Sequence, residues 1–206
     1  MNNVVTRSFV LLAVATAIVL VSAFVAPPGT AATTMASTNQ DPMAGMDMGD
    51  MGEVVNSEET FITGMIPHHQ EAVESARAVL ETTERPEVRE LAQNVIVTQT
   101  EEIALLEGWR ARWYPDAAEA DYTPMMADPA GLSPDAADRT FLEGMIEHHR
   151  GAIDMAQSHL GADYEKQPEV AGLAEGIVTV QDGEIAQMQG WLTDWYGDAD
   201  ADHNAH

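Results

Sequence analysis

The chain contains two copies of one unit, and this duplication restricts its fold more than any other feature of the sequence. Residues 61–80 match residues 141–160 with 9 identities in 20 positions, and residues 86–114 match residues 168–196 with 13 identities in 29. Each copy consists of a first segment, a short gap and a second segment. The sequence therefore predicts two similar halves that pack with pseudo-twofold symmetry.

All four segments have the features of helices. Ser57 can cap the first one, and a proline suits the first turn of each of the others, at Pro86, Pro134 and Pro168. Each segment spans roughly 26–29 residues, which corresponds to a helix about 40 Å long. The short gaps make each pair of helices an antiparallel hairpin, and no alternation typical of a strand appears.

Residues 115–133 separate the two hairpins and contain three prolines. This spacer is long enough to cross a bundle, as the long connection of ferritin-like folds does. We therefore predict an all-α protein, a ferritin-like four-helix bundle built from two duplicated helical hairpins over residues 57–196. An acidic tail, residues 197–206, follows it, and we expect its His203 and His206 to be a solvated end with weak affinity for a divalent ion at most.

The N-terminus has the pattern of an export signal. Arg7 precedes an uncharged apolar run at residues 9–25, and a Pro-Pro-Gly break and small residues follow. We expect residues 1–32 to be a cleaved signal peptide. An uncleaved N-terminal anchor is the alternative, because a membrane span needs about 17–25 apolar residues. Both readings place the rest of the chain outside the cytoplasm, in the cell envelope, the periplasm or the extracellular space.

The charge balance points to cations as partners. The 206 residues include 34 acidic and 9 basic side chains, a formal net charge of −25, and no cysteine. A nucleic-acid partner would require a basic face, so we expect none. The absence of cysteine excludes disulfides, thiolate zinc sites and iron–sulfur clusters.

A methionine-rich stretch precedes the first helix. Residues 33–56 show no helical or strand period, and we interpret them as a flexible linker. Within it, Met43, Met46, Met48 and Met51 stand among glycine and aspartate rather than among the aliphatic residues of a core. Thioethers are soft ligands that select Cu(I), so we predict metal capture here, with a low-complexity tether as the alternative.

Two carboxylates on apolar faces are the most informative residues of the helices. Glu102 and Glu184 fall within the apolar stripes of the second and fourth helices, each one turn after a glutamine, Gln99 or Gln181. A buried carboxylate without a partner is costly, so each requires one.

The first and third helices supply the expected partners. His69 and His149 lie near the middle of the apolar faces, whereas His68 and His148 lie at the edges, where they could support the central site or form one at the rim. Imidazole and carboxylate suit Cu(II), zinc or iron, and methionine with histidine suits Cu(I). The alternative is a metal-free His–Glu network that fixes the register of the helices.

The candidate metal ligands of the helices are His69, His149, Glu102, Glu184, His68, His148, Gln99, Gln181, Met65 and Met145. Met65 and Met145 also fit an ordinary role as core fillers. His159 and Met155 have no counterpart in the other half, and we expect them on the flank of the third helix.

The string Met65-Ile66-Pro67-His68-His69, followed by Gln99 and Glu102, resembles a bacterial family of exported, ferritin-like four-helix proteins of unknown function. That family includes cyanobacterial periplasmic copper-binding proteins involved in copper resistance. The resemblance covers about residues 57–196, in both halves, although Glu147 replaces Pro67 in the second. It implies that the Met and His residues of both strings are copper ligands: Met65, His68, His69, Met145, His148 and His149.

The sequence therefore predicts a non-enzymatic, extracytoplasmic copper-binding protein for metal sequestration or hand-over. Copper as Cu(I) or Cu(II) is the expected metal, with zinc or iron as alternatives. A copper exporter or chaperone is the partner that hand-over would require, and a membrane contact is expected only if the N-terminal segment is not cleaved. A ferritin-like metal oxidase using the His/Glu cluster is the second hypothesis, and a metal-free structural or interaction bundle is the third.

Overall fold

The computed structural model describes residues 55–197, and this part of the chain consists of four helices and no strand. The helices are α1 (Glu58–Leu80), α2 (Pro86–Trp113), α3 (Pro134–Gly161) and α4 (Pro168–Tyr196). The predicted all-α bundle of two hairpins is confirmed. The predicted signal, nearly all of the linker and most of the acidic tail lie outside the described residues.

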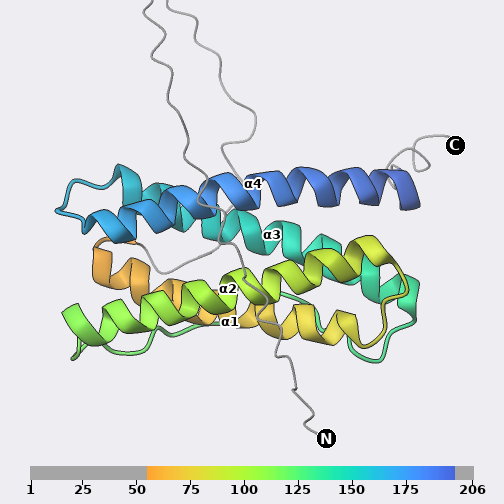
Figure 1. Ribbon diagram of the computed structural model, residues 1–206, viewed down its shortest axis with the longest axis horizontal. Coiled ribbons are helices and arrows are strands. Elements are labelled where there is room, and N and C mark those ends of the chain that lie inside the picture. The colour runs from red at the N-terminus through yellow and green to blue at the C-terminus, as the bar shows by residue number, and fades with distance from the viewer. Residues whose placement is uncertain (1–54, 198–206) are drawn as a thin grey trace, which may run out of the picture. The chain divides into compact units, whose positions relative to one another are not determined.

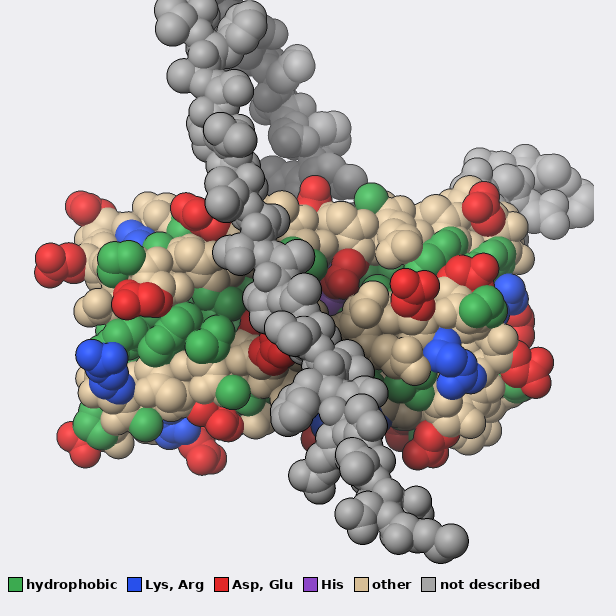
Figure 2. Space-filling model, viewed as in Figure 1, with side chains coloured by type: hydrophobic (Ala, Val, Ile, Leu, Met, Phe, Trp, Pro, Cys, Tyr) green, Lys and Arg blue, Asp and Glu red, His purple; other side chains and the backbone are tan. Residues whose placement is uncertain are grey.

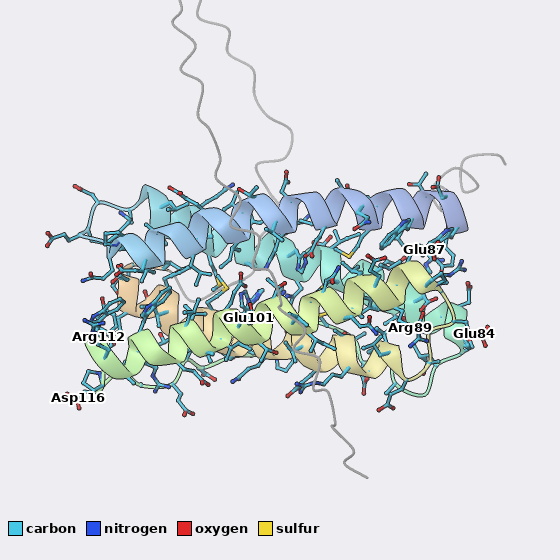
Figure 3. The ribbon with its side chains drawn as sticks, viewed as in Figure 1. Glu84, Glu87, Arg89, Glu101, Arg112 and Asp116 are labelled. Atoms are coloured by element: carbon cyan, nitrogen blue, oxygen red, sulfur yellow. The ribbon has the colours of Figure 1, made fainter. Side chains whose placement is uncertain are left out.

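The two hairpins lie one above the other, with α3–α4 over α1–α2 in Figure 1. α1 packs along α2, α3 packs along α4, and the hairpins meet mainly through α1 and α3. α2 extends from one end of the bundle to the other: Glu84, Glu87 and Arg89 lie at one end in Figure 3, and Arg112 and Asp116 lie at the opposite end. No helix in the described part of the chain is long and apolar enough to span a membrane.

The predicted helix starts are confirmed by the backbone. Ser57 Oγ accepts a hydrogen bond from the Thr60 N–H at 3.1 Å, and Thr60 Oγ1 accepts one from the Ser57 N–H at 3.1 Å. Such a reciprocal cap satisfies two of the N–H groups that a helix start leaves free. α2, α3 and α4 each begin with proline, whose missing N–H costs nothing at that position.

The acidic residues at equivalent positions of α1 and α3 each bind the opposite hairpin. Glu58 is buried and accepts hydrogen bonds from the Gln167 N–H at 2.7 Å and from the Tyr114 hydroxyl at 3.0 Å. Asp138, also buried, lies with Oδ2 at 3.3 Å from Arg85 Nε. Since Gln167 and Arg85 are the N-caps of α4 and α2, each hairpin secures the start of the other hairpin's second helix.

The apolar core is divided into two clusters by a polar layer. One cluster contains Phe141 and Met145, and the other contains Phe61 and Met65. Histidine and glutamine side chains occupy buried positions between these clusters: His68, His69, His148, His149, Gln99 and Gln181. A buried polar layer reduces the apolar area that the core could otherwise gain, so its presence requires a compensating interaction.

The spacer passes along the length of the bundle. It leaves α2 beside Tyr114, which is bonded to Glu58, and it reaches α3 beside Asp135, whose carboxylate lies 2.6 Å from Arg85 Nη2. Arg85 precedes the first residue of α2, so the spacer begins at one end of that helix and finishes near the other. On this path it crosses the middle of α1 and α3.

Candidate metal centre

Four imidazoles lie at the centre of the bundle, and all are buried. His68 and His69 are at the middle of α1, and His148 and His149 are at the same height of α3. Consecutive residues of a helix point about 100° apart, so one histidine of each pair faces the hairpin partner and the other faces the opposite hairpin. The duplicated His-His dipeptide therefore supplies two different environments.

The outer environment is a His–Glu contact, which occurs once within each hairpin. His69 Nε2 lies 2.8 Å from Glu102 Oε2, and His149 Nε2 is hydrogen-bonded to Glu184 Oε2 at 2.8 Å. The His69 contact has the same length but lacks the direction of a good hydrogen bond. The prediction that Glu102 and Glu184 find histidine partners is confirmed. Their side chains are 17% and 21% exposed, so the carboxylates are partly rather than fully buried.

The inner environment is a direct contact between the two hairpins. The ring centroids of His68 and His148 are 3.7 Å apart, with the ring planes tilted by 37°. The expectation that these two histidines lie at an edge or rim is wrong, because both side chains are buried. α1 and α3 pack against each other as well as against α2 and α4, and the two histidines lie where α1 meets α3. Burial, followed by the nearby His148, His69 and His149, lowers the pKa of His68 well below its ordinary value. Burial also lowers the pKa of His149, although Glu184 opposes this effect.

Glu71 connects this inner contact to the spacer. Its Oε1 accepts hydrogen bonds from the N–H groups of Met125 and Met126, both at 2.7 Å, and its Oε2 accepts one from the Tyr122 hydroxyl. Oε2 also lies 3.4 Å from His148 Nε2. Burial raises the pKa of Glu71, but the interactions with His148, Tyr122 and the Met126 N–H outweigh it and lower this pKa to about 2.

A shallow groove on the α2–α4 face leads toward the outer pairs. Its cavity has a volume of about 10 Å³, enough for one water-sized occupant, and it is lined by Gln99, Glu102, Gln181 and Glu184 among others. Both glutamine Oε1 atoms are buried without a hydrogen-bond partner. Figure 2 shows this face of the bundle, on which acidic side chains lie along both α2 and α4. Oxygen and carboxylate donors therefore collect at the position where a cation could enter.

The remaining candidate ligands are distributed differently. Met65 and Met145 are fully buried, one in each apolar cluster, where they fill the core. Met43, Met46, Met48 and Met51 lie outside the described residues. Between residues 55 and 197, no three His, Asp or Glu side chains converge closely enough to hold one metal ion, so the structure groups these donors in pairs.

The expectation that His159 lies on the flank of α3 is wrong, whereas Met155 is partly buried. His159 is buried, stacks on Phe61 with a centroid distance of 4.5 Å, and its Nδ1 is hydrogen-bonded to the Tyr164 hydroxyl at 2.7 Å. Met155 packs against the same apolar cluster. The polar tyrosine after α3 gives His159 a partner, and this allows the imidazole to be buried.

A family model described as a domain of unknown function, DUF305, matches residues 24–110, 58–192 and 138–206. The chain belongs to the DUF305 family. The overlapping matches to each half agree with the duplication in the sequence. No curated protein matches the chain.

Solved structures of DUF305 type have the same bundle. CopM in the Cu(I)-bound form is 34% identical, with a TM-score of 0.60 over 68% of this chain and 99% of CopM. CopM in the Cu(II)-bound form is 32% identical, with a TM-score of 0.56 over 67% of this chain and 97% of CopM. A DUF305 fragment from Deinococcus radiodurans is 33% identical, with a TM-score of 0.59 over 66% of this chain and 95% of the fragment.

Proposed function

We propose that this DUF305 protein binds copper outside the cytoplasm and holds it for sequestration or for transfer to an exporter or chaperone. The observation that carries the proposal is the layer of four buried imidazoles at the centre of the bundle. Both ring nitrogens of His68 and His148 are buried without a hydrogen-bond partner, and so is Nδ1 of His69 and of His149. Buried polar atoms are normally satisfied, so these unpaired nitrogens are suited to bind a metal ion.

The donor types support copper in particular. Neutral imidazole with nearby carboxylate and amide oxygens suits Cu(II), and thioether with imidazole suits Cu(I). Copper is also the metal of the similar protein CopM, which has been solved in Cu(I)-bound, Cu(II)-bound and Ag-bound forms. The proposed ligands of the bundle are His69 and His149 with Glu102 and Glu184, supported by the glutamines of the α2–α4 groove.

The methionine-rich linker is a second, separate site in this proposal. Met43, Met46, Met48 and Met51 offer thioethers, whose affinity for Cu(I) is independent of pH because the group carries no proton. The apolar run at residues 9–25 supports export of the protein. The net charge of −25 would raise the local concentration of cations around both sites, and added salt would screen this effect.

The test is a titration of the full chain with Cu(I) and Cu(II) in separate experiments. Deletion of residues 33–56 is expected to reduce Cu(I) capacity and to spare divalent binding that is lost in acid. Replacement of His69 and His149 by Ala is expected to do the reverse. His159→Gln serves as the control, because this buried histidine lies away from the central layer. Loss of both activities in the deletion, and of neither in the double histidine variant, would leave the bundle as a scaffold only.

A further inference from the structure

The pseudo-twofold symmetry of α1 and α3 is broken at one functional position. Glu71 follows His68 by three residues in α1, and Gly151 follows His148 by three residues in α3. Residues three apart lie on the same face of a helix, so positions 71 and 151 both face the histidine of the opposite helix. Glu71 accordingly reaches His148, whereas Gly151 offers no side chain to His68.

The missing side chain at Gly151 is required by the position of His68. A Cβ atom on Gly151 would lie 3.1 Å from His68 Nε2, which is closer than ordinary van der Waals contact, and 3.7 Å from the methyl carbon of Met125. His68 Nε2 and the end of the Met125 side chain therefore border the same spot on the backbone of α3. His68 is buried, and neither of its ring nitrogens has a hydrogen-bond partner.

The spacer holds Met125 at this spot and leaves it reachable from solvent. The Met125 N–H donates to Glu71 Oε1, which fixes the backbone beside the inner histidines. The Met125 residue is 38% exposed, although the histidine beside it is buried. A methionine side chain rotates about three bonds and can turn its sulfur toward a neighbour without movement of the backbone.

We propose that His68 Nε2 and the Met125 thioether form a site for Cu(I), in which Gly151 provides the space and His148 lies alongside. This site deepens the proposed copper-binding function and rests on it. It adds a thioether from the spacer that belongs neither to the helical strings nor to the methionine-rich linker. Imidazole and thioether are neutral donors suited to a soft monovalent ion. The nearby Glu71 carboxylate supplies one negative charge that matches the single charge of Cu(I).

The test uses the diamagnetic ion Ag(I) as a substitute for Cu(I), with the full chain labelled by ¹³C at the methionine methyl groups. We expect Ag(I) to shift the Met125 methyl signal, which is assigned by its loss in Met125→Leu. Met126→Leu is the matched control. Its backbone also binds Glu71, but its methyl group lies 3.2 Å from the Cβ position of Gly144 and not at Gly151. Met125→Leu should weaken Ag(I) binding at this site by at least about tenfold, and Met126→Leu should not.

A second variant tests the space at Gly151. Gly151→Ala should abolish the Ag(I) shift of Met125 while circular dichroism shows an intact helical fold. Gly183→Ala in α4 should leave the shift unchanged, because no atom lies within 4 Å of its Cβ position. If Ag(I) binds to the chain but leaves the Met125 methyl signal unshifted, this inference is overturned and the proposed function survives. If the chain retains no Ag(I) or copper at all, both fail.

Discussion

Glu58, in the first turn of α1, accepts a hydrogen bond from the backbone N–H of Gln167, which precedes α4 by one residue and follows Glu58 by 109 positions. The same carboxylate accepts the hydroxyl hydrogen bond of Tyr114 at the end of α2. One buried side chain thus joins three helix ends, and α4 has no cap from its own N-cap side chain.

Glu58→Ala should therefore destabilise the bundle. It removes two part-buried hydrogen bonds, from the Tyr114 hydroxyl and the Gln167 N–H, to a carboxylate. A hydrogen bond to a charged group contributes about 1.5–3 kcal/mol, and solvent access to both donors places the expected loss toward the lower end. Urea unfolding followed by circular dichroism measures the change. Glu74→Ala, at an exposed position of α1, is the control and should unfold like the parent. Equal stability of both variants would show that the carboxylate of Glu58 contributes nothing.

Glu102→Ala should reduce stability or metal binding more than the same change at its neighbour Glu101. The substitution leaves His69 Nε2 buried without its carboxylate, at a cost of about 1–3 kcal/mol. Glu101 lies on the exposed side of α2, so its loss should change little (Figure 3). Thermal melts with and without copper separate the structural effect from the metal effect. Identical melts of Glu102→Ala and the parent in both conditions would contradict the importance of the pair.

Glu71→Ala should release the spacer from the bundle. The Met125 and Met126 N–H groups lose their acceptor, so their hydrogen exchange should accelerate by about tenfold or more. The pKa of Glu71 is lowered to about 2, so its stabilising effect is complete above its ordinary pKa of 4.5 and disappears only as pH falls toward 2. Hydrogen exchange of the parent at pH 6 and pH 5 should accordingly show the same protection at these two amides, after correction for intrinsic rates.

His159 should make stability depend on pH between about 6.5 and 4. Burial, and secondarily the charge of Lys166, lowers the pKa of His159 to about 4. In this range the unfolded chain binds a proton that the folded chain does not, so stability falls as pH falls, by at most about 1.4 kcal/mol per pH unit for one group. His159→Phe should show a smaller decrease between pH 7 and pH 5 in urea unfolding. A decrease as steep as that of the parent would refute this assignment.

The helices, their starts and the His–Glu pairs could be predicted from the sequence because each rests on local or repeated information. Prolines and Ser57 mark the helix starts, and the apolar stripe around Glu102 requires a partner that the duplicated histidines supply. The Glu71 contacts could not be predicted, since they join residues 51 to 55 positions apart through a spacer without a period. The burial of His68 and His148 could not be predicted in the same way. A helical wheel identifies one apolar face, whereas α1 packs against two neighbouring helices, α2 and α3, and is buried on two faces.

The reciprocal contacts of Glu58 and Asp138 have a consequence for the origin of the chain. Each acidic residue binds the residue that precedes the second helix of the other half, as in the self-complementary interface of a twofold homodimer. Two separate copies of one hairpin would therefore carry the same pair of contacts, and fusion of the copies would need only a connection along the bundle. The twofold symmetry of two hairpins gives the bundle two equivalent sides, and a single spacer can cover only one of them. The spacer lies on one side only, where Glu71 contacts both His148 and the spacer, whereas the equivalent position of the second half is Gly151. The two halves of the bundle are therefore not interchangeable at this position.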